Sequence, residues 1–223
     1  MSSTEFSFTD IQNQWQERVK NQTIGESFRV RLHRSLSWAQ QMETHQEEDR
    51  VDEAFLCSWI ALNALFARWD DDLQQCLPER QSMQRLIDQC LILDQDRILL
   101  KCLQDLHWHI EQLLSNKYLD TRFWRELDQD KNEHQADDFS KRYEFFLRKG
   151  QGVLLSQTLL KVYLMRNQLM HGAATYNSDM NRHTLLLCSH IVDQLLRRFL
   201  FLLTDGYKPS IDLGGLPYPP VKE

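Results

Sequence analysis

Glycine and proline are scarce in this chain: 7 glycines and 5 prolines are spread over 223 residues. A sandwich or barrel of short strands needs frequent turns, and those turns depend heavily on these two residue types. Apolar residues recur instead at helical spacing, as at Phe28, Leu32, Leu36 and Ala39 within residues 27–43. The sequence therefore predicts an all-α fold.

Helical periodicity divides most of the chain into candidate helices. We expect them over residues 9–20, 27–43, 49–70, 79–93, 95–116, 118–128, 138–149, 153–171 and 179–204. Gly172 and Gly206 follow the last two, where a glycine in a left-handed conformation commonly closes a helix. Ser178 is the expected N-cap of the final helix. Residues 127–140 are charged and aperiodic, so we expect an exposed loop there.

These helices predict one domain, a helical bundle over residues 26–204. Residues 1–25 are polar and rich in glutamine and asparagine, and residues 205–223 are rich in proline and glycine and are expected to form an extended tail. We find no internal repeat and no change of composition that would mark a second domain.

Charge, cysteines and hydropathy narrow the function classes. The net charge of −6 disfavours a general nucleic-acid coat protein, which needs a broad basic face, but leaves room for a local basic pocket. Five cysteines without a C-x-x-C pair indicate reduced thiols rather than disulfides or a zinc site. The first ten residues lack a signal peptide pattern, and the apolar run Phe199–Leu203 is too short to span a bilayer. We expect a soluble, cytoplasmic protein without membrane contact.

The sequence contains no recognisable metal-binding or cofactor-binding motif. His107 and His109 lie two apart on a predicted helix, where side chains diverge by about 200°, so they cannot share a metal. The sequence contains no glycine-rich phosphate loop and no zinc-protease or serine-hydrolase motif. We therefore expect neither a metal nor a cofactor.

The helix at 153–172 carries polar residues where its pattern reserves apolar ones. Gln157, Lys161 and Gln168 mark its expected solvent face, and Arg166 falls opposite them, within the apolar face. Asn167 and His171 continue one flank of the helix, at positions i and i+4. Two explanations are open. Arg166 pairs with a buried carboxylate while His171 is a cation at the helix end, or these residues line a pocket or subunit interface built for an anion.

Asn63 poses a similar question in the most apolar helix, 49–70. Apolar side chains cover almost every direction around this helix, which predicts burial on all sides. A buried amide must find hydrogen-bond partners. Asn63 either bonds a neighbouring helix or supports a polar site.

The string MRNQLMHG at the end of the 153–172 helix resembles the R-N-x-x-x-H signature of the HEPN superfamily (higher eukaryotes and prokaryotes nucleotide-binding domain). Three further strings resemble Apea-like HEPN proteins: WIALNALF at 59–66, RNQLMHGAATYNSDMNR at 166–182 and the terminal YPPV. Together they span about residues 26–223. The chain departs from one branch of the family at Ala173, where antitoxin-coupled members carry a tyrosine.

The resemblance implies an up-and-down helical bundle of HEPN type, here with additional helices and a C-terminal tail, that forms a homodimer. Many family members are metal-independent endoribonucleases in toxin–antitoxin, phage-defence or stress-response systems, and others are inactive or act as binding modules. The family motif maps onto Arg166, Asn167 and His171.

We therefore expect RNA cleavage by attack of the 2′-hydroxyl, leaving a 2′,3′-cyclic phosphate. His171 would transfer the proton, Arg166 would stabilise the phosphate, and Asn167 would orient the histidine or a phosphate oxygen. Asn63 would support this site. Cationic residues expected to form an RNA-binding rim are Arg29, Arg31, Arg34, Lys141 and Arg142.

Two non-catalytic alternatives use the same residues. A binding module would hold a nucleotide, RNA, or an acidic segment of an antitoxin or other partner protein without turnover. A purely structural motif would only pair protomers. The acidic net charge favours both alternatives, because RNA must approach against the overall field.

Overall fold

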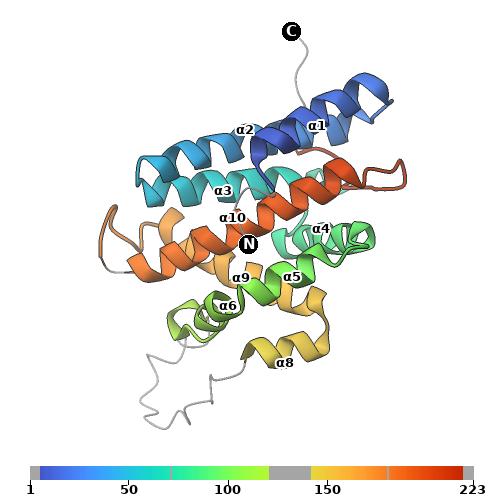
Figure 1. Cartoon of the computed structure of the whole chain (residues 1–223). Coiled ribbons are helices and arrows are strands. Elements are labelled where there is room, and N and C mark those ends of the chain that lie inside the picture. Colours follow the sequence, from blue (N-terminus) through green and yellow to red (C-terminus); the bar gives the residue numbers. More distant parts are fainter. Residues whose placement is uncertain (1–5, 71, 121–141, 180, 218–223) are drawn as a thin grey trace.

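The computed structural model describes residues 6–70, 72–120, 142–179 and 181–217 (Figure 1). The predicted all-α helical bundle is confirmed. The helices are α1 (Phe8–Asn21), α2 (Glu26–Glu47), α3 (Val51–Phe66), α4 (Glu79–Leu93), α5 (Ile98–Asp105), α6 (His107–Leu114), α8 (Arg142–Lys149), α9 (Gln151–Met170) and α10 (Arg182–Asp205). The remaining elements are a 3-10 turn, η1 (Lys117–Leu119), and two short antiparallel strands, β1 (Trp69–Asp70) and β2 (Gln75–Cys76).

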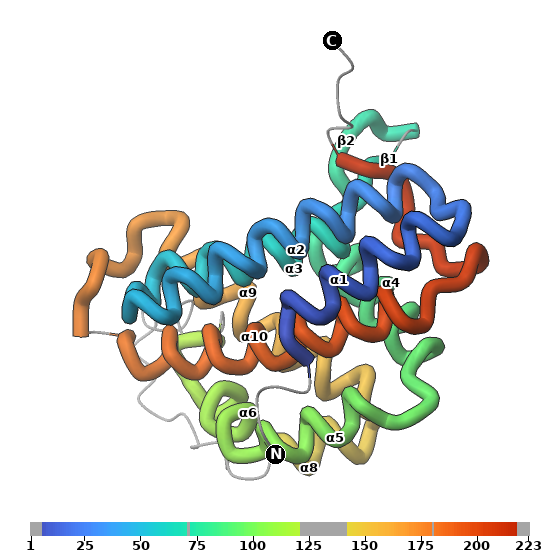
Figure 2. Tube along the Cα trace, turned by 45° about the horizontal axis from the view of Figure 1, so that its top comes forward, coloured from blue at the N-terminus to red at the C-terminus, as the bar shows by residue number. Residues whose placement is uncertain are grey.

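Helix α10 crosses the middle of the molecule and contacts α1, α3, α4, α5, α6 and α9 (Figure 1). Its apolar side chains from Leu185 to Leu203 are mostly buried. The hairpin of α2 and α3 lies on one side of α10, and α5, α6 and α8 lie on the other (Figures 1 and 2). None of the described helices combines the length and apolar content that a bilayer crossing needs.

Two predicted helices are longer than the real ones. The helix expected to reach residue 70 ends at Phe66, where Ala67 becomes extended and the chain turns into the β1–β2 hairpin. Ile60 on this helix is 38% exposed, so the expected burial on all sides is wrong. The helix expected over 95–116 is broken at Leu106 into α5 and α6. Periodicity missed both changes because apolar residues pack inward whether or not the backbone stays helical.

The start of the last helix also differs from expectation. Helix α10 begins at Arg182 after Asn181, whose φ of 70° is left-handed, so Ser178 is not its N-cap. The helix expected to begin at residue 118 is a 3-10 turn at Lys117–Leu119. Residues 121–141, which include the expected loop and Lys141, lie outside the described residues, as does the YPPV string.

The two helix-closing glycines behave differently. Gly172 has a φ of 71°, and its N–H donates to Leu169 O while the N–H of Ala173 donates to Gln168 O. This is the Schellman arrangement, and the prediction is confirmed. Gly206 has a φ of −86°, so a left-handed cap is wrong there. A Cβ at Gly206 would lie 2.8 Å from Leu202 O, so close backbone approach requires glycine.

Described segments on both sides of the predicted bundle of residues 26–204 pack into the same core. In α1, Phe8, Ile11 and Trp15 are buried in the common core, and α1 packs on α2 and α10. Beyond α10, Ile211 and Leu213 are buried as well. The tail then runs beside β1 and β2 (Figure 2), where the N–H of Trp69 donates to the carbonyl of Gly215.

Arg31 joins α2, α3 and this tail. Its side chain is 1% exposed, and the structure records no carboxylate within ion-pair distance of it among the described residues. The guanidinium donates instead to five carbonyl oxygens, which belong to Ala64, Leu65, Ala67, Gly214 and Gly215 at 2.6–3.3 Å. Burial, with repulsion from Arg68, lowers the pKa of Arg31 to about 10, so it stays charged at neutral pH.

We predict that Arg31→Met destabilises the protein by more than about 3 kcal/mol, because the carbonyls around it lose their buried donor. Chemical denaturation monitored by circular dichroism measures the change. Arg29→Met is the matched control on the exposed side of the same helix and should stay within about 0.5 kcal/mol of the wild type. Equal stability of the two variants would contradict the role assigned to Arg31.

Candidate functional site

Helix α9 is buried along its first part and open at its end. Its buried side chains are Leu154, Leu155, Thr158, Leu159, Val162 and Met165. In the last turn, Arg166 and Asn167 are half-buried, Met170 is 59% exposed, and the C-cap residue His171 is exposed. The apolar stripe therefore anchors the helix and leaves the motif at the surface.

Arg166 is held by three neighbours. Its Nη1 donates to Asn167 Oδ1 at 2.9 Å, and its Nη2 lies 3.6 Å from Glu79 Oε1. The guanidinium carbon lies 5.6 Å from the centre of the Trp59 ring, a cation–π arrangement. The sequence-based alternative of an Arg–Glu pair is thus present, but both side chains remain a quarter to a third exposed.

His171 follows directly from the end of α9. Its backbone N–H donates to Asn167 O, and Gly172 turns the chain away after it. Because the side chain is exposed and the Schellman turn fixes the backbone on both sides, the imidazole is accessible without any change in packing. The structure thus brings Arg166, Asn167 and His171 to one helix end.

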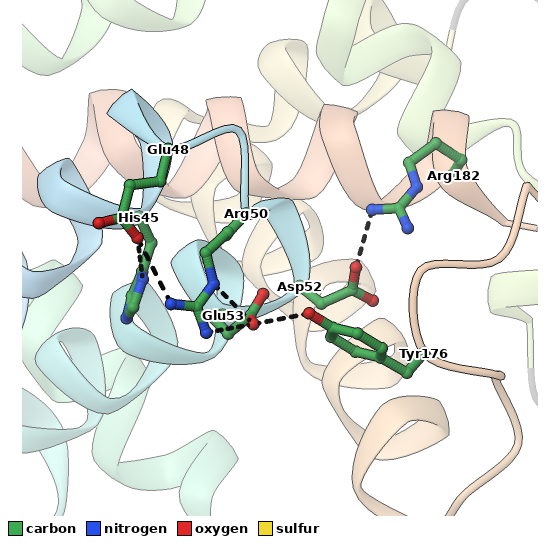
Figure 3. A network of polar contacts seen from close by, with 7 residues as sticks. All are labelled: His45, Glu48, Arg50, Asp52, Glu53, Tyr176 and Arg182. Atoms are coloured by element: carbon green, nitrogen blue, oxygen red, sulfur yellow. Dashed lines mark hydrogen bonds and ion pairs between the residues drawn. The ribbon is translucent and has the colours of Figure 1, made fainter.

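The loop after His171 is fastened to the start of α3 (Figure 3). The hydroxyl of Tyr176 donates to Glu53 Oε1 at 2.8 Å, and the same oxygen accepts from Arg50. The Nη1 of Arg182, the first residue of α10, lies 2.8 Å from Asp52 Oδ2. These contacts hold the middle of the loop, at Tyr176, and the first residue of α10 against the start of α3.

Asn63 does not make the interhelical hydrogen bond that its position suggested. The structure records no hydrogen bond from its side chain within the described residues and none between it and Arg166. Its half-buried amide instead lines a cavity of about 230 Å³ between α2, α3 and the tail. The supporting role of Asn63 in the Arg166 cluster therefore stays a prediction.

The members of the expected basic set that the structure describes do not form one rim. Arg31 is buried, and its guanidinium donates to backbone carbonyls. The expectation that it contacts RNA is therefore wrong. Arg29 is exposed on α2, and Arg34 is half-buried there. Arg142 lies on α8, on the far side of α10 from α2 (Figure 1), where it donates to Leu114 O.

The predicted solvent face of α9 is also wrong in part. The Nζ of Lys161 donates to Leu119 O at 2.8 Å, and the side-chain amide of Gln168 donates to Tyr118 O at 2.9 Å. Both residues therefore anchor η1. The hydrophobic periodicity could not predict this contact. The groups of η1 that accept these hydrogen bonds are backbone carbonyls, which contribute nothing to a hydropathy pattern.

Sequence reasoning missed Glu79 and Trp59 as neighbours of Arg166. Glu79 is the first residue of α4 after Pro78, where an acidic residue is ordinary in any helix. Trp59 is 3% exposed, and its place in an apolar helix predicts only that it packs in the core. Neither residue carries a sequence signal for the pairing, which depends on how α3, α4 and α9 meet.

Comparison of the chain with protein-family models, curated proteins and solved structures returned no significant match. Within the described part of the chain, no group of three or more His, Cys, Asp or Glu side chains is placed to hold a metal ion.

We predict that Glu53 makes stability depend on pH. Partial burial raises its pKa, but hydrogen bonds from Arg50 and Tyr176 lower it more, from the ordinary 4.5 to about 2. The stabilisation is complete above pH about 4.5 and is lost as the pH falls towards 2. Melting curves should show that Glu53→Gln flattens the decline in this window, whereas Glu47→Gln, exposed on α2, leaves it unchanged. Parallel declines in both variants would refute the role of Glu53.

Proposed function

We propose that the protein is a metal-independent endoribonuclease whose catalytic residues are Arg166, Asn167 and His171. The observation that carries the proposal is their common position at the exposed end of α9, with the guanidinium bonded to Asn167. The resemblance of MRNQLMHG to the R-N-x-x-x-H signature of HEPN ribonucleases supports the same assignment.

The chemistry needs only groups that this site offers. The 2′-hydroxyl of RNA attacks the adjacent phosphorus, the bond to the 5′-oxygen breaks, and a 2′,3′-cyclic phosphate and a 5′-hydroxyl result. His171 transfers the proton, and Arg166 stabilises the charge that develops on the phosphoryl oxygens. Asn167 acts on Arg166 by accepting its hydrogen bond, which fixes the direction of the guanidinium.

Two copies of the chain complete the site in this proposal. Cleavage needs a base for the 2′-hydroxyl and an acid for the leaving oxygen, and one histidine does not easily serve as both at once. A twofold homodimer that faces two α9 ends into one cleft supplies both. An antitoxin or other partner protein would act by covering this cleft. We place the protein in the cytoplasm, where cysteines stay reduced and the RNA substrate is present.

One observation favours the second candidate, a non-catalytic HEPN module that binds a nucleotide, RNA or a partner protein. Glu79 lies 3.6 Å from Arg166, so the guanidinium already has a carboxylate beside it. A phosphate therefore competes with Glu79 for the guanidinium of Arg166.

We predict that the purified protein cleaves single-stranded RNA equally well with and without excess EDTA. His171→Ala should lower the rate by about 10²–10⁴, and Arg166→Ala should abolish cleavage. His183→Ala is the matched control, since His183 is exposed at the start of α10. Product analysis should find 2′,3′-cyclic phosphate ends, and light scattering of the same sample should give twice the 26.7 kDa chain mass.

Three results would refute this function. They are loss of cleavage on chelation with recovery on adding Mg²⁺, wild-type rates in folded Arg166→Ala and His171→Ala variants, and no cleavage of any RNA by a dimeric protein. The last result would leave the binding module as the better assignment.

We predict that Glu79→Gln increases RNA affinity several-fold at low salt, because it removes the carboxylate that competes for Arg166 and one negative charge. Fluorescence anisotropy with a labelled RNA measures the change. Glu47→Gln removes the same charge elsewhere and is the control. A lower melting temperature of Glu79→Gln without any gain in affinity would assign the ion pair to structure alone.

A further inference from the structure

We propose a second binding site, a pocket for one unpaired nucleobase between α2, α3 and the C-terminal tail. This inference rests on the proposed action on RNA. The cavity measures about 230 Å³, and the residues that bear on the argument are Arg34, Trp38, Ile60, Asn63, Leu216 and Pro217.

The walls of the cavity are apolar side chains that the fold leaves uncovered. Trp38 on α2 is 40% exposed, and Ile60 on α3 is 38% exposed. Leu216 and Pro217 line the cavity from the tail, which Arg31 fixes in place through Gly214 and Gly215. A partly exposed indole beside aliphatic walls is suited to stacking with a planar ring, and such stacking accepts every base.

Asn63 supplies the polar group in this apolar surrounding. Its amide makes no hydrogen bond within the described residues, and it presents a donor beside an acceptor. The Watson–Crick edge of each nucleobase also presents a donor beside an acceptor, so one amide can bond any base twice. That edge is free only when the base is unpaired, which selects single-stranded RNA over a duplex.

Size and charge agree with one base attached to a backbone. Pockets for drug-sized ligands measure about 300–1,000 Å³, so this smaller cavity suits a single ring system. The cation Arg34 lines the same cavity and donates to Pro217 O at 3.4 Å, which places positive charge beside the base. A nucleotide seated here would bring its phosphate towards that charge.

The pocket adjoins the Arg166 cluster along two elements. Asn63 lies one helical turn, about 6 Å, beyond Trp59, whose ring faces Arg166. Cys76 lines the pocket three residues before Glu79, the carboxylate paired with Arg166. A base in the pocket would therefore belong to a nucleotide near the one whose phosphate meets Arg166, and the pocket would help to place the strand.

Binding of a 2′-O-methyl RNA hexanucleotide tests the pocket apart from cleavage, because this probe lacks the attacking hydroxyl. Calorimetry should show that Trp38→Ala and Asn63→Ala each weaken binding about 5- to 100-fold. Trp38→Phe, which keeps an aromatic ring, should retain most of the affinity. Trp108→Ala is the control, since Trp108 is 56% exposed on α6. The same hexanucleotide annealed to its complement should bind more weakly.

Each result decides for or against the pocket. Unchanged affinity in folded Trp38→Ala and Asn63→Ala variants overturns it, as does equal binding of the duplex or absence of binding to the wild type. Cleavage of RNA with unaffected pocket variants rejects the pocket while the ribonuclease stands. Binding that depends on Trp38 and Asn63 without any RNA cleavage rejects the ribonuclease while the pocket stands.

Discussion

A buried cation whose two terminal nitrogens donate to backbone carbonyls organises one end of this protein. The last carbonyls of α3 have no partner within the helix, and the helix dipole places partial negative charge on them. Arg31 meets Ala64, Leu65 and Ala67 at that end and bonds the tail at Gly214 and Gly215 with its other nitrogen. One side chain thereby joins α2, α3 and a segment that follows it by more than 180 residues.

The tail can approach Arg31 closely because of a glycine. Gly214 has a φ of 80°, and a Cβ there would lie 2.1 Å from the Nε of Arg68. Any other residue would strain the backbone and displace Arg68 as well. The tail segment that lines the Trp38–Asn63 cavity therefore owes its position to Arg31 and Gly214 together, which makes the proposed base pocket dependent on the buried cation.

The Arg166 cluster follows a different principle, since it lies where packing ends. The buried stripe of α9 stops at Met165, and the next turn carries a charged, an amide and an imidazole side chain. Asn167, Glu79 and the Trp59 ring compensate the guanidinium while leaving it partly exposed. Arg166 is partly exposed, so it can exchange Glu79 for an incoming phosphate. Arg31 is enclosed by carbonyls and cannot make such an exchange.

The sequence by itself determined the helical class, most helix positions, the Gly172 turn, and the departure of Arg166 from the apolar pattern of α9. These follow from local properties: turn-residue content, apolar spacing and the left-handed freedom of glycine. Only the tertiary structure decided that Arg31 is buried while Arg29 is exposed, that Glu79 faces Arg166, and that Asn63 opens into a cavity. Hydropathy records how polar a side chain is, and the partners that satisfy it, above all backbone carbonyls and distant helices, exist only once the chain is folded.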